Sequence, residues 1–208
     1  MRLDLHIHTT LGSACSSMSP DEMMKSALEA DLDGVCITEH NRIWKPEQAD
    51  GLSQKYGIAV FRGIEITTTG GDILVFGLDE EPQGMMTPHQ LRQRVDEAQA
   101  VAIAAHPFRG FLLFGFGMLQ MSVDDAKDNP TFSQVHGLEI CNSKVTDEEN
   151  EFARTVAEMM GLIKLGGSDA HDIDGVGSCV TVFDSVIRSD NDLARAILTG
   201  KFSLERCK

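Results

Sequence analysis

The sequence is poor in basic residues. Its 208 residues include 18 Lys and Arg against 32 Asp and Glu, a formal net charge of −14 at pH 7. Such a charge repels phosphate backbones and anionic lipid, so we expect neither duplex nucleic acid nor a membrane surface as a partner. Bound multivalent cations would offset part of the charge, since each divalent ion adds two positive charges. The acidic residues are therefore candidate metal ligands.

The sequence also lacks paired cysteines and long apolar runs. Its five cysteines are widely spaced and none forms a CxxC pair, which argues against both a disulfide framework and a cysteine-based zinc site. We therefore expect a reducing, cytoplasmic location. The N-terminus is charged from Arg2 onward, and no stretch approaches the roughly 18 apolar residues of a membrane span. These absences predict a protein that is neither secreted nor inserted in a membrane.

Short apolar runs alternate with capped helical stretches along the chain. The expected strands cover residues 2–7, 34–38, 58–67, 72–78, 101–105, 136–141, 162–165 and 178–183, and the expected helices cover 20–30, 45–56, 87–99, 146–160 and 192–198. Gly70 and Gly71 predict a hairpin-type turn between the third and fourth strands. The alternation is typical of an α/β fold with a largely parallel sheet. We predict one domain over residues 1–208, a closed or nearly closed α/β barrel, with an open doubly wound sheet as the alternative.

One stretch breaks this rhythm. Residues 107–130 combine many Phe, Leu and Met side chains with three glycines between 110 and 117, which is too much glycine for a helix. We expect a long loop packed on the core, with a substrate lid or an oligomer contact as alternatives.

Histidines and carboxylates gather at the ends of the predicted strands. His6 and His8 end the first strand one residue apart, so a strand's period of two points both rings to the same face. Five further side chains come late in, or just after, later strands: His40, Glu65, His106, Asp169 and His171. In an α/β barrel the carboxyl ends of the strands converge at one mouth. We therefore predict that all of these residues face a common point.

Several buried carboxylates and imidazoles at one point need partners, because desolvated polar groups are costly. Divalent cations would satisfy them, and five imidazoles with two carboxylates exceed the ligands of one zinc. We expect at least two ions with Glu65 as the bridging carboxylate, and the mixed nitrogen and oxygen set suits Zn, Mn or Fe better than Ca or Mg. His89, inside a helix, and His136, at a strand start, lack this context and are expected on the surface or in the core.

Five motifs occur in order at these strand ends: HxH at His6, then TEHN, GIEIT, AHP and GSDAH. Together they resemble the polymerase and histidinol phosphatase (PHP) family of metal-dependent phosphoesterases, over essentially the whole chain. The resemblance implies a distorted seven-stranded (β/α) TIM-like barrel with two or three metal ions at its mouth. It implies a first ion on His6, His8, Glu65 and Asp169, a second on Glu65 and His106, and a third on His40 and His171. Glu139 and Asn142 match the strand that supplies a further ligand or a group behind the ligands.

The sequence departs from the family pattern at two places. Family members often carry an Asp or His a few residues after HxH, where this chain has Ser13 or Ala14. Neither is a good metal ligand, so we expect the third ion to be weak or absent, unless Cys15 substitutes as a thiolate rather than being an inert turn residue. Glu39 stands where Asp is usual, and we expect it to orient a ligand imidazole.

The predicted function is hydrolysis of a phosphate monoester or diester by a metal-activated water, on a small phosphorylated metabolite, nucleotide or short oligonucleotide. Arg109 is either a bidentate phosphate clamp or a solvated loop residue, and His171 or Asp169 is a candidate for protonating the leaving alkoxide. Two alternatives stay open. A metal-dependent amidohydrolase usually needs a bridging lysine, for which Lys164 is the nearby candidate, without a matching motif. The other is a non-catalytic, metal-stabilised scaffold module.

Overall fold

The computed structural model describes residues 1–110 and 122–206, in which nine strands form one sheet. The strand order is β7-β6-β5-β4-β3-β2-β1-β8-β9. The strands are β1 (Arg2–Ile7), β2 (Gly34–Ile37), β3 (Ala59–Thr68), β4 (Gly71–Phe76), β5 (Val101–Ala104), β6 (Gly137–Cys141), β7 (Ile163–Gly166), β8 (Cys179–Phe183) and β9 (Phe202–Arg206). All eight predicted strands are present, with ends that differ by at most two residues.

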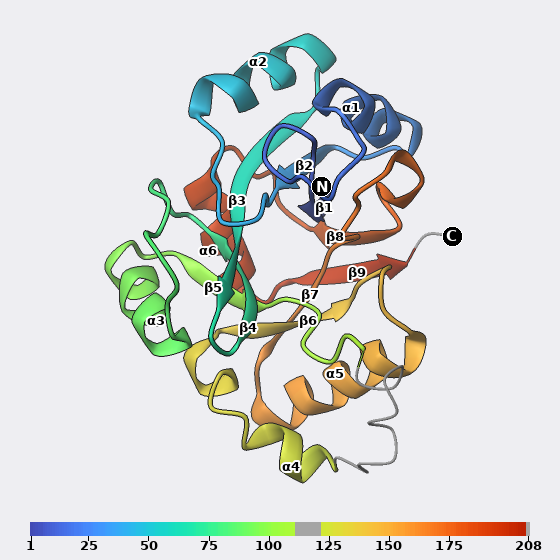
Figure 1. Cartoon of the computed structure of the whole chain (residues 1–208). Helices are drawn as coiled ribbons and strands as arrows, with labels where there is room; N and C mark the ends of the chain where they lie inside the picture. The colour runs from blue at the N-terminus through green and yellow to red at the C-terminus, as the bar shows by residue number, and fades with distance from the viewer. Residues whose placement is uncertain (111–121, 207–208) are drawn as a thin grey trace.

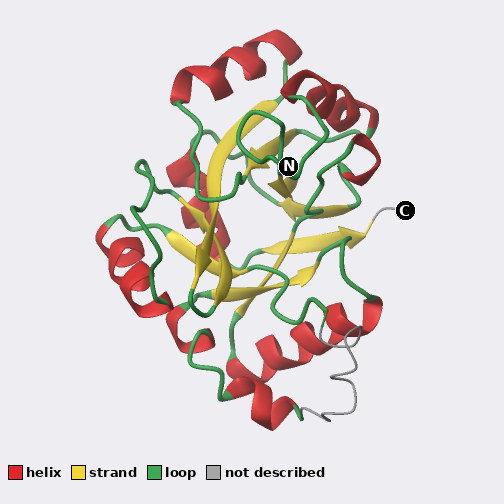
Figure 2. Ribbon diagram, in the orientation of Figure 1, coloured by secondary structure: helices red, strands yellow, loops and turns green. Residues whose placement is uncertain are grey.

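The helices lie around the outside of the strands (Figures 1 and 2). They are α1 (Pro20–Glu29), α2 (Pro46–Tyr56), α3 (Pro88–Glu97), α4 (Val123–Lys127), α5 (Asp147–Met160) and α6 (Asp190–Thr199). Capping boxes begin α1, α3 and α5 at Ser19, Thr87 and Thr146, where the side-chain oxygen accepts a backbone N–H of the first turn. None of the helices among the described residues is long and apolar enough to span a bilayer.

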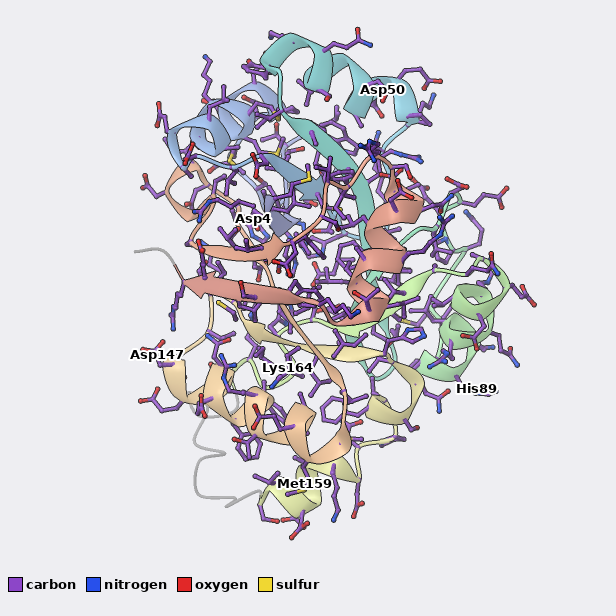
Figure 3. The ribbon with its side chains drawn as sticks, turned by 180° about the vertical axis from the view of Figure 1, so that it is seen from behind. Asp4, Asp50, His89, Asp147, Met159 and Lys164 are labelled. Atoms are coloured by element: carbon purple, nitrogen blue, oxygen red, sulfur yellow. The ribbon has the colours of Figure 1, made fainter. Side chains whose placement is uncertain are left out.

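The sheet curls into a nearly closed barrel, which confirms the predicted fold class. Side chains from well-separated strands pack into one apolar cluster with α6, which lies in front of the strands in the rear view of Figure 3. The cluster includes Leu5, Phe61, Leu74, Ile103, Leu165, Leu193 and Ile197. Since these strands stand far apart in the sheet order, they share a cluster only because the sheet wraps around it.

The sheet is less parallel than predicted. β1–β2, β2–β3, β5–β6 and β6–β7 are parallel, whereas β3–β4, β4–β5, β1–β8 and β8–β9 are antiparallel. The tight turn at Gly70 and Gly71 sends the chain straight back as β4 without a crossover helix. Because β4 is antiparallel to both neighbours, β3 and β5 still run in the same direction and end at the same mouth.

Two elements were not predicted. β9 has an alternating, half-buried pattern rather than an apolar run, so its burial depends on pairing with β8. α4 lies inside the stretch expected to be a loop. In that stretch, Phe108 is buried and packs edge-on against Phe132 and Phe152, as a loop packed on the core would. Residues 111–121, on which the lid and oligomer-contact alternatives depend, lie outside the described residues.

Candidate metal centre

The structure brings all seven predicted ligand residues together at the barrel mouth. They come from the ends of β1, β2, β3, β5 and β7, or from the residue or loop that follows each of these strands. His6, His8, Glu65 and Asp169 are buried, and the His106 side chain is 8% exposed. His40 and His171 are partly exposed, at 36% and 21% of their side-chain surface. The cluster is therefore deep on the β1 side and open to solvent at the two outer imidazoles.

Glu65 lies at the centre of the cluster. Its Oε2 is 2.9 Å from Nδ1 of His40, 3.2 Å from Nε2 of His8 and 3.5 Å from Nε2 of His6. Its Oε1 is 3.0 Å from Nε2 of His106. A carboxylate with four imidazoles at its two oxygens has the placement that a bridging ligand needs.

Asp169 occupies the other side of the same space. Its Oδ1 lies 3.3 Å from Nε2 of His8 and 3.5 Å from Nε2 of His6, and its Oδ2 lies 4.0 Å from Nε2 of His106. Both Asp169 and His106 have left-handed backbone conformations, with φ of 58° and 28°. Such conformations are uncommon for residues other than glycine and tend to occur at functional sites.

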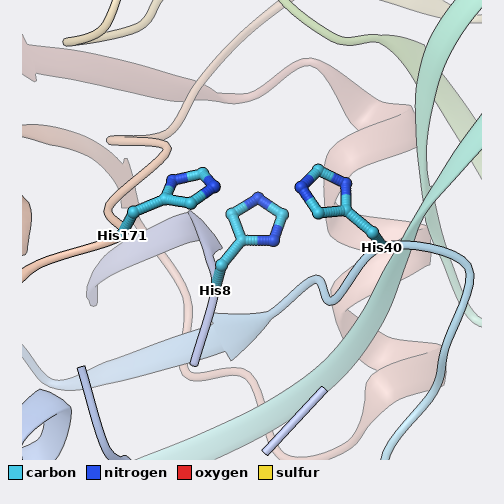
Figure 4. A group of neighbouring side chains, drawn as sticks. All are labelled: His8, His40 and His171. Carbon is cyan, nitrogen blue, oxygen red and sulfur yellow. The ribbon is translucent and has the colours of Figure 1, made fainter. Parts of the chain in front are cut away.

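Despite these short distances, three buried polar atoms at this point have no partner in hydrogen-bond geometry within the described chain: Nε2 of His6, Nε2 of His8 and Oε2 of Glu65. Buried polar atoms are almost always paired. Candidate ligand atoms come within 4.8 Å of one another in three groups: His6, His8 and Asp169; His6, Glu65 and His106; and His8, His40 and His171. Figure 4 shows the third group, with His8 between the other two rings. The residues present fit two or three divalent ions.

Hydrogen bonds behind the cluster orient the rings of His6 and His171 and hold the backbone of His106. Nδ1 of His6 donates to Oε1 of Glu139 at 2.8 Å, since a carboxylate can only accept, and this leaves Nε2 free for an ion. Oε2 of Glu139 accepts from the backbone N of His106 and from Nδ2 of Asn142. Nδ1 of His171 donates to the carbonyl of Asp169. Glu139 and Asn142 therefore orient ligand side chains.

Contacts with Glu39 account for Ser13, which lies where family members often carry an Asp or His. The buried Ser13 hydroxyl donates to Oε2 of Glu39 at 2.5 Å and lies 3.2 Å from Nδ1 of His8. Because the Ser13 hydroxyl donates its hydrogen bond to Glu39, its oxygen accepts a hydrogen bond from Nδ1 of His8. This again leaves Nε2 of His8 facing the cluster. Glu39 also accepts from Thr9 and from Nε1 of Trp44. Glu39 thus orients a ligand imidazole through Ser13, not by direct contact.

Burial and neighbouring charges shift the pKa values of Glu65, His6 and His8 in different directions. Burial opposes ionisation of Glu65, but the imidazoles of His6, His106 and His40 outweigh it and hold the pKa of Glu65 well below its ordinary value. Burial also opposes a charge on His6, yet Glu139 and Glu65 raise its pKa to about 10. For His8, burial lowers the pKa to about 4. A proton on His6 therefore balances part of the negative charge of the carboxylates. A bound divalent cation would balance that charge in place of the proton.

Asp4 is a functional-site residue that sequence reasoning missed. Its carboxylate is fully buried and accepts backbone N–H groups from His6, Ser168 and Gly177. It ties β1 to the loop that carries Asp169. The available signal was a carboxylate flanked by Leu3 and Leu5 inside an apolar strand.

The remaining singled-out residues lie elsewhere. His89 is exposed beside Gln134, and Nδ1 of His136 accepts from the backbone of Ala102. Cys15 is exposed and takes part in none of the three ligand groups found among the described residues. Lys164 bonds to Glu158 on α5, on the rear view of Figure 3. The amidohydrolase alternative therefore lacks its candidate bridging lysine.

Comparison with known proteins decides the family. A PHP-domain model matches residues 4–141, and a model of the PHP-associated segment matches residues 147–202. The chain belongs to the PHP family. This confirms the resemblance inferred from the five motifs.

One sequence relative and two solved structures are similar to this PHP protein at low identity. An uncharacterised protein of Methanocaldococcus jannaschii is 28% identical over 199 residues, which cover 93% of this chain and 76% of the relative. A candidate metal-dependent phosphoesterase from Bifidobacterium adolescentis has a TM-score of 0.66 at 17% identity, over 96% of each chain. An amidohydrolase from Chromobacterium violaceum, solved with sulfate and no metal, has a TM-score of 0.66 at 14% identity, over 98% of this chain and 97% of the other. The two structural likenesses establish the fold.

Proposed function

We propose that this PHP protein hydrolyses phosphate esters of a small substrate, as a metal-dependent phosphatase or phosphodiesterase. The observation that carries the proposal is the convergence of seven ligand-type side chains, with three unpartnered buried atoms, at the mouth of the barrel. The similarity to a candidate phosphoesterase supports the same reaction class.

The residues that would hold the ions are those of the three ligand groups. Glu65 is the candidate for a shared carboxylate, because its two oxygens lie near different imidazoles, those of His40 and His106. Divalent ions bound there would supply an activated water, with a pKa near about 7, and a Lewis acid for phosphate oxygens. Glu139 and Ser13 keep Nε2 of His6 and of His8 directed at the cluster. No cysteine or serine nucleophile is then needed for hydrolysis.

We propose that Arg109 binds the phosphate. It follows His106 by three residues and forms an ion pair with Oδ2 of Asp169, while 39% of its side chain stays exposed. A planar guanidinium at the solvent side of the cluster can take two phosphate oxygens at once. We propose that a substrate phosphate replaces Asp169 as the ion-pair partner of the Arg109 guanidinium.

A small pocket adjoins the cluster at His106, and we propose that it receives part of the substrate. It has a volume of about 260 Å³ and is lined by His106 and Arg109 together with Asp72, Asn129 and Thr131. Pockets for drug-sized ligands are usually about 300–1,000 Å³. The polar lining and small volume favour a phosphorylated metabolite or a single nucleotide over a longer oligonucleotide.

The sequence offered His171 or Asp169 as a candidate for protonating the leaving alkoxide. Burial, with the charges on neighbouring histidines, lowers the pKa of His171 to about 4, so its ring is neutral near pH 7. Its Nδ1 proton is engaged by the carbonyl of Asp169. These contacts favour ligand roles for both residues, and we propose the proton-transfer role for Asp169 or His171 as secondary.

The test is hydrolysis of p-nitrophenyl phosphate, its bis-ester and a panel of amides, with Mn²⁺ and after chelation. We expect phosphoester turnover with Mn²⁺, its loss after chelation, and a large loss in Asp169→Asn. Glu47→Gln, an exposed carboxylate on α2, is the matched control and should keep full activity. Amide turnover without phosphoester turnover would favour the amidohydrolase. A chelation-sensitive melting temperature with no turnover of any ester or amide would favour the scaffold module.

A further inference from the structure

Two thiols that are far apart in the sequence meet inside the barrel wall. Sγ of Cys141 lies 2.8 Å from Sγ of Cys179, at a sequence separation of 38. Both are buried, Cys141 at 6% exposure and Cys179 at 0%. The sequence pattern alone, with widely spaced cysteines and no CxxC, did not indicate this pair.

The pair lies where the two ends of the sheet approach each other. Cys141 ends β6, which pairs with the terminal strand β7. Cys179 begins β8, which lies between β1 and β9 at the opposite end of the strand order. Oγ1 of Thr181 in β8 donates to the carbonyl of Gly166 in β7 at 2.8 Å. We call this junction of β6 and β7 with β8 the barrel seam. β7 and β8 are not neighbours in the strand order, and the bond from Thr181 to Gly166 is one of the contacts that join them.

We propose that Cys141 and Cys179 form a reversible disulfide that closes the barrel seam when the protein meets a peroxide. A disulfide bond is about 2.05 Å long, so the two sulfur atoms need to approach by less than about 1 Å. The proposal concerns the seam and is independent of the proposed hydrolytic activity.

The chemistry uses hydrogen peroxide as the two-electron oxidant. The sulfur of Cys141, the more exposed of the two, attacks one peroxide oxygen, the O–O bond breaks, and a sulfenic acid forms with release of water. The sulfur of Cys179 then attacks the sulfenic sulfur, the S–O bond breaks, and a second water leaves with the Cys179 proton. Overall two thiols lose two hydrogens and one peroxide becomes two waters. A small dithiol reverses the bond by exchange.

Local contacts connect the seam to the metal centre. The carbonyl of Cys141 accepts the backbone N–H of Gly167 at 3.0 Å. A Cβ added to Gly167 would lie 2.5 Å from Cβ of His6, so the backbone there is packed directly on a candidate ligand. A cross-link at Cys141 would hold this segment against β1 and β8.

The first experiment counts and locates thiols in the wild-type chain, stripped of metal by chelation so that bound ions do not catalyse oxidation. After peroxide, alkylation under denaturing conditions should fall from five labelled cysteines to three, with an intact mass lower by two hydrogen atoms. Peptide mapping without reduction should yield one linked pair, Cys141 with Cys179. Dithiothreitol should restore all five labels. Five labels after peroxide, or a linked peptide that contains Cys15 or Cys207, would overturn the proposal.

The second experiment measures melting temperature, because a cross-link across the seam restricts the unfolded chain. Closing a loop of this length should raise the melting temperature by an amount of the order of 10 °C, reversibly. Cys141→Ser and Cys179→Ser should each abolish both the rise and the loss of two labels. Cys36→Ser, which changes a buried cysteine away from the seam, is the matched control and should retain both. An equal melting temperature for the cross-linked and reduced forms would refute closure of the seam.

Discussion

The central position of Glu65 predicts the effect of Glu65→Gln. The substitution keeps the shape of the side chain but removes the negative charge that four imidazoles share at distances of 2.9–3.5 Å. Two ions on either side of this carboxylate would both lose an anionic ligand. We therefore expect metal content to fall by more than one ion per chain.

The magnitude follows from the linkage between binding and folding. Metal at 100 times its Kd raises the free energy of unfolding by about 2.7 kcal/mol for one independent site. In a chain of this length about 1 kcal/mol corresponds to roughly 2–4 °C of melting temperature. Two ions should therefore raise the melting temperature of the wild type by roughly 10–20 °C. In Glu65→Gln, we expect at most one site's share of that rise.

The assay combines elemental analysis after dialysis with melting curves, with and without Mn²⁺ or Zn²⁺. The metal-induced shift is compared within each variant, which cancels any change in the stability of the metal-free protein. Glu47→Gln removes an exposed carboxylate of the same kind and should behave as the wild type. Full metal content together with an undiminished shift in Glu65→Gln would refute the bridging role.

Substitutions at three further positions test the surroundings of the centre. Ser13→Ala removes the acceptor of His8 and a partner of Glu39, so metal affinity should fall by about 10–100-fold in a competition titration with a chelating dye; unchanged affinity would show that His8 needs no such support. Arg109→Ala should lower kcat on phosphoesters by about 10²–10³-fold with metal content intact, as for loss of an oriented donor, and Arg109→Lys should recover only part, because an ammonium lacks the bidentate fork. Normal turnover in both would identify a solvated loop arginine. Asp4→Ala leaves three backbone N–H groups without their acceptor, and at about 1–3 kcal/mol for each buried donor the loss in urea unfolding should reach about 3 kcal/mol or more. The exposed Asp50→Ala on α2 should cost little, and an equal cost for both would contradict the buried role of Asp4.

Much of the fold could be predicted because its signals are local. The capping boxes at Ser19, Thr87 and Thr146 and the apolar runs between them depend on neighbouring residues, so the corresponding helices and strands lie close to their expected positions. Strand direction is not local in this sense. The prediction of a largely parallel sheet was wrong for β4 and β8, and β9 was not predicted, since pairing partners are chosen by the whole sheet.

The candidate centre shows the same division. The histidines and acids were recognisable because each ends a strand, and the barrel architecture brings such ends together. The contacts behind them were not predictable in detail. The support of His8 by Glu39 acts through Ser13, and Asp4 binds backbone groups 164 and 173 residues away, at Ser168 and Gly177. Such contacts depend on loop conformations that no short motif encodes.

By itself, the sequence determined the residue types: an acidic chain, five ordered motifs, and ligand side chains at successive strand ends. Those properties belong to single segments, and they were sufficient to indicate the family and the kind of site. Only the tertiary structure decided which atoms meet, including Glu65 among four imidazoles and Cys141 beside Cys179. The physical reason is that a distance between segments is set by sheet register, curvature and packing, which are properties of the folded chain as a whole.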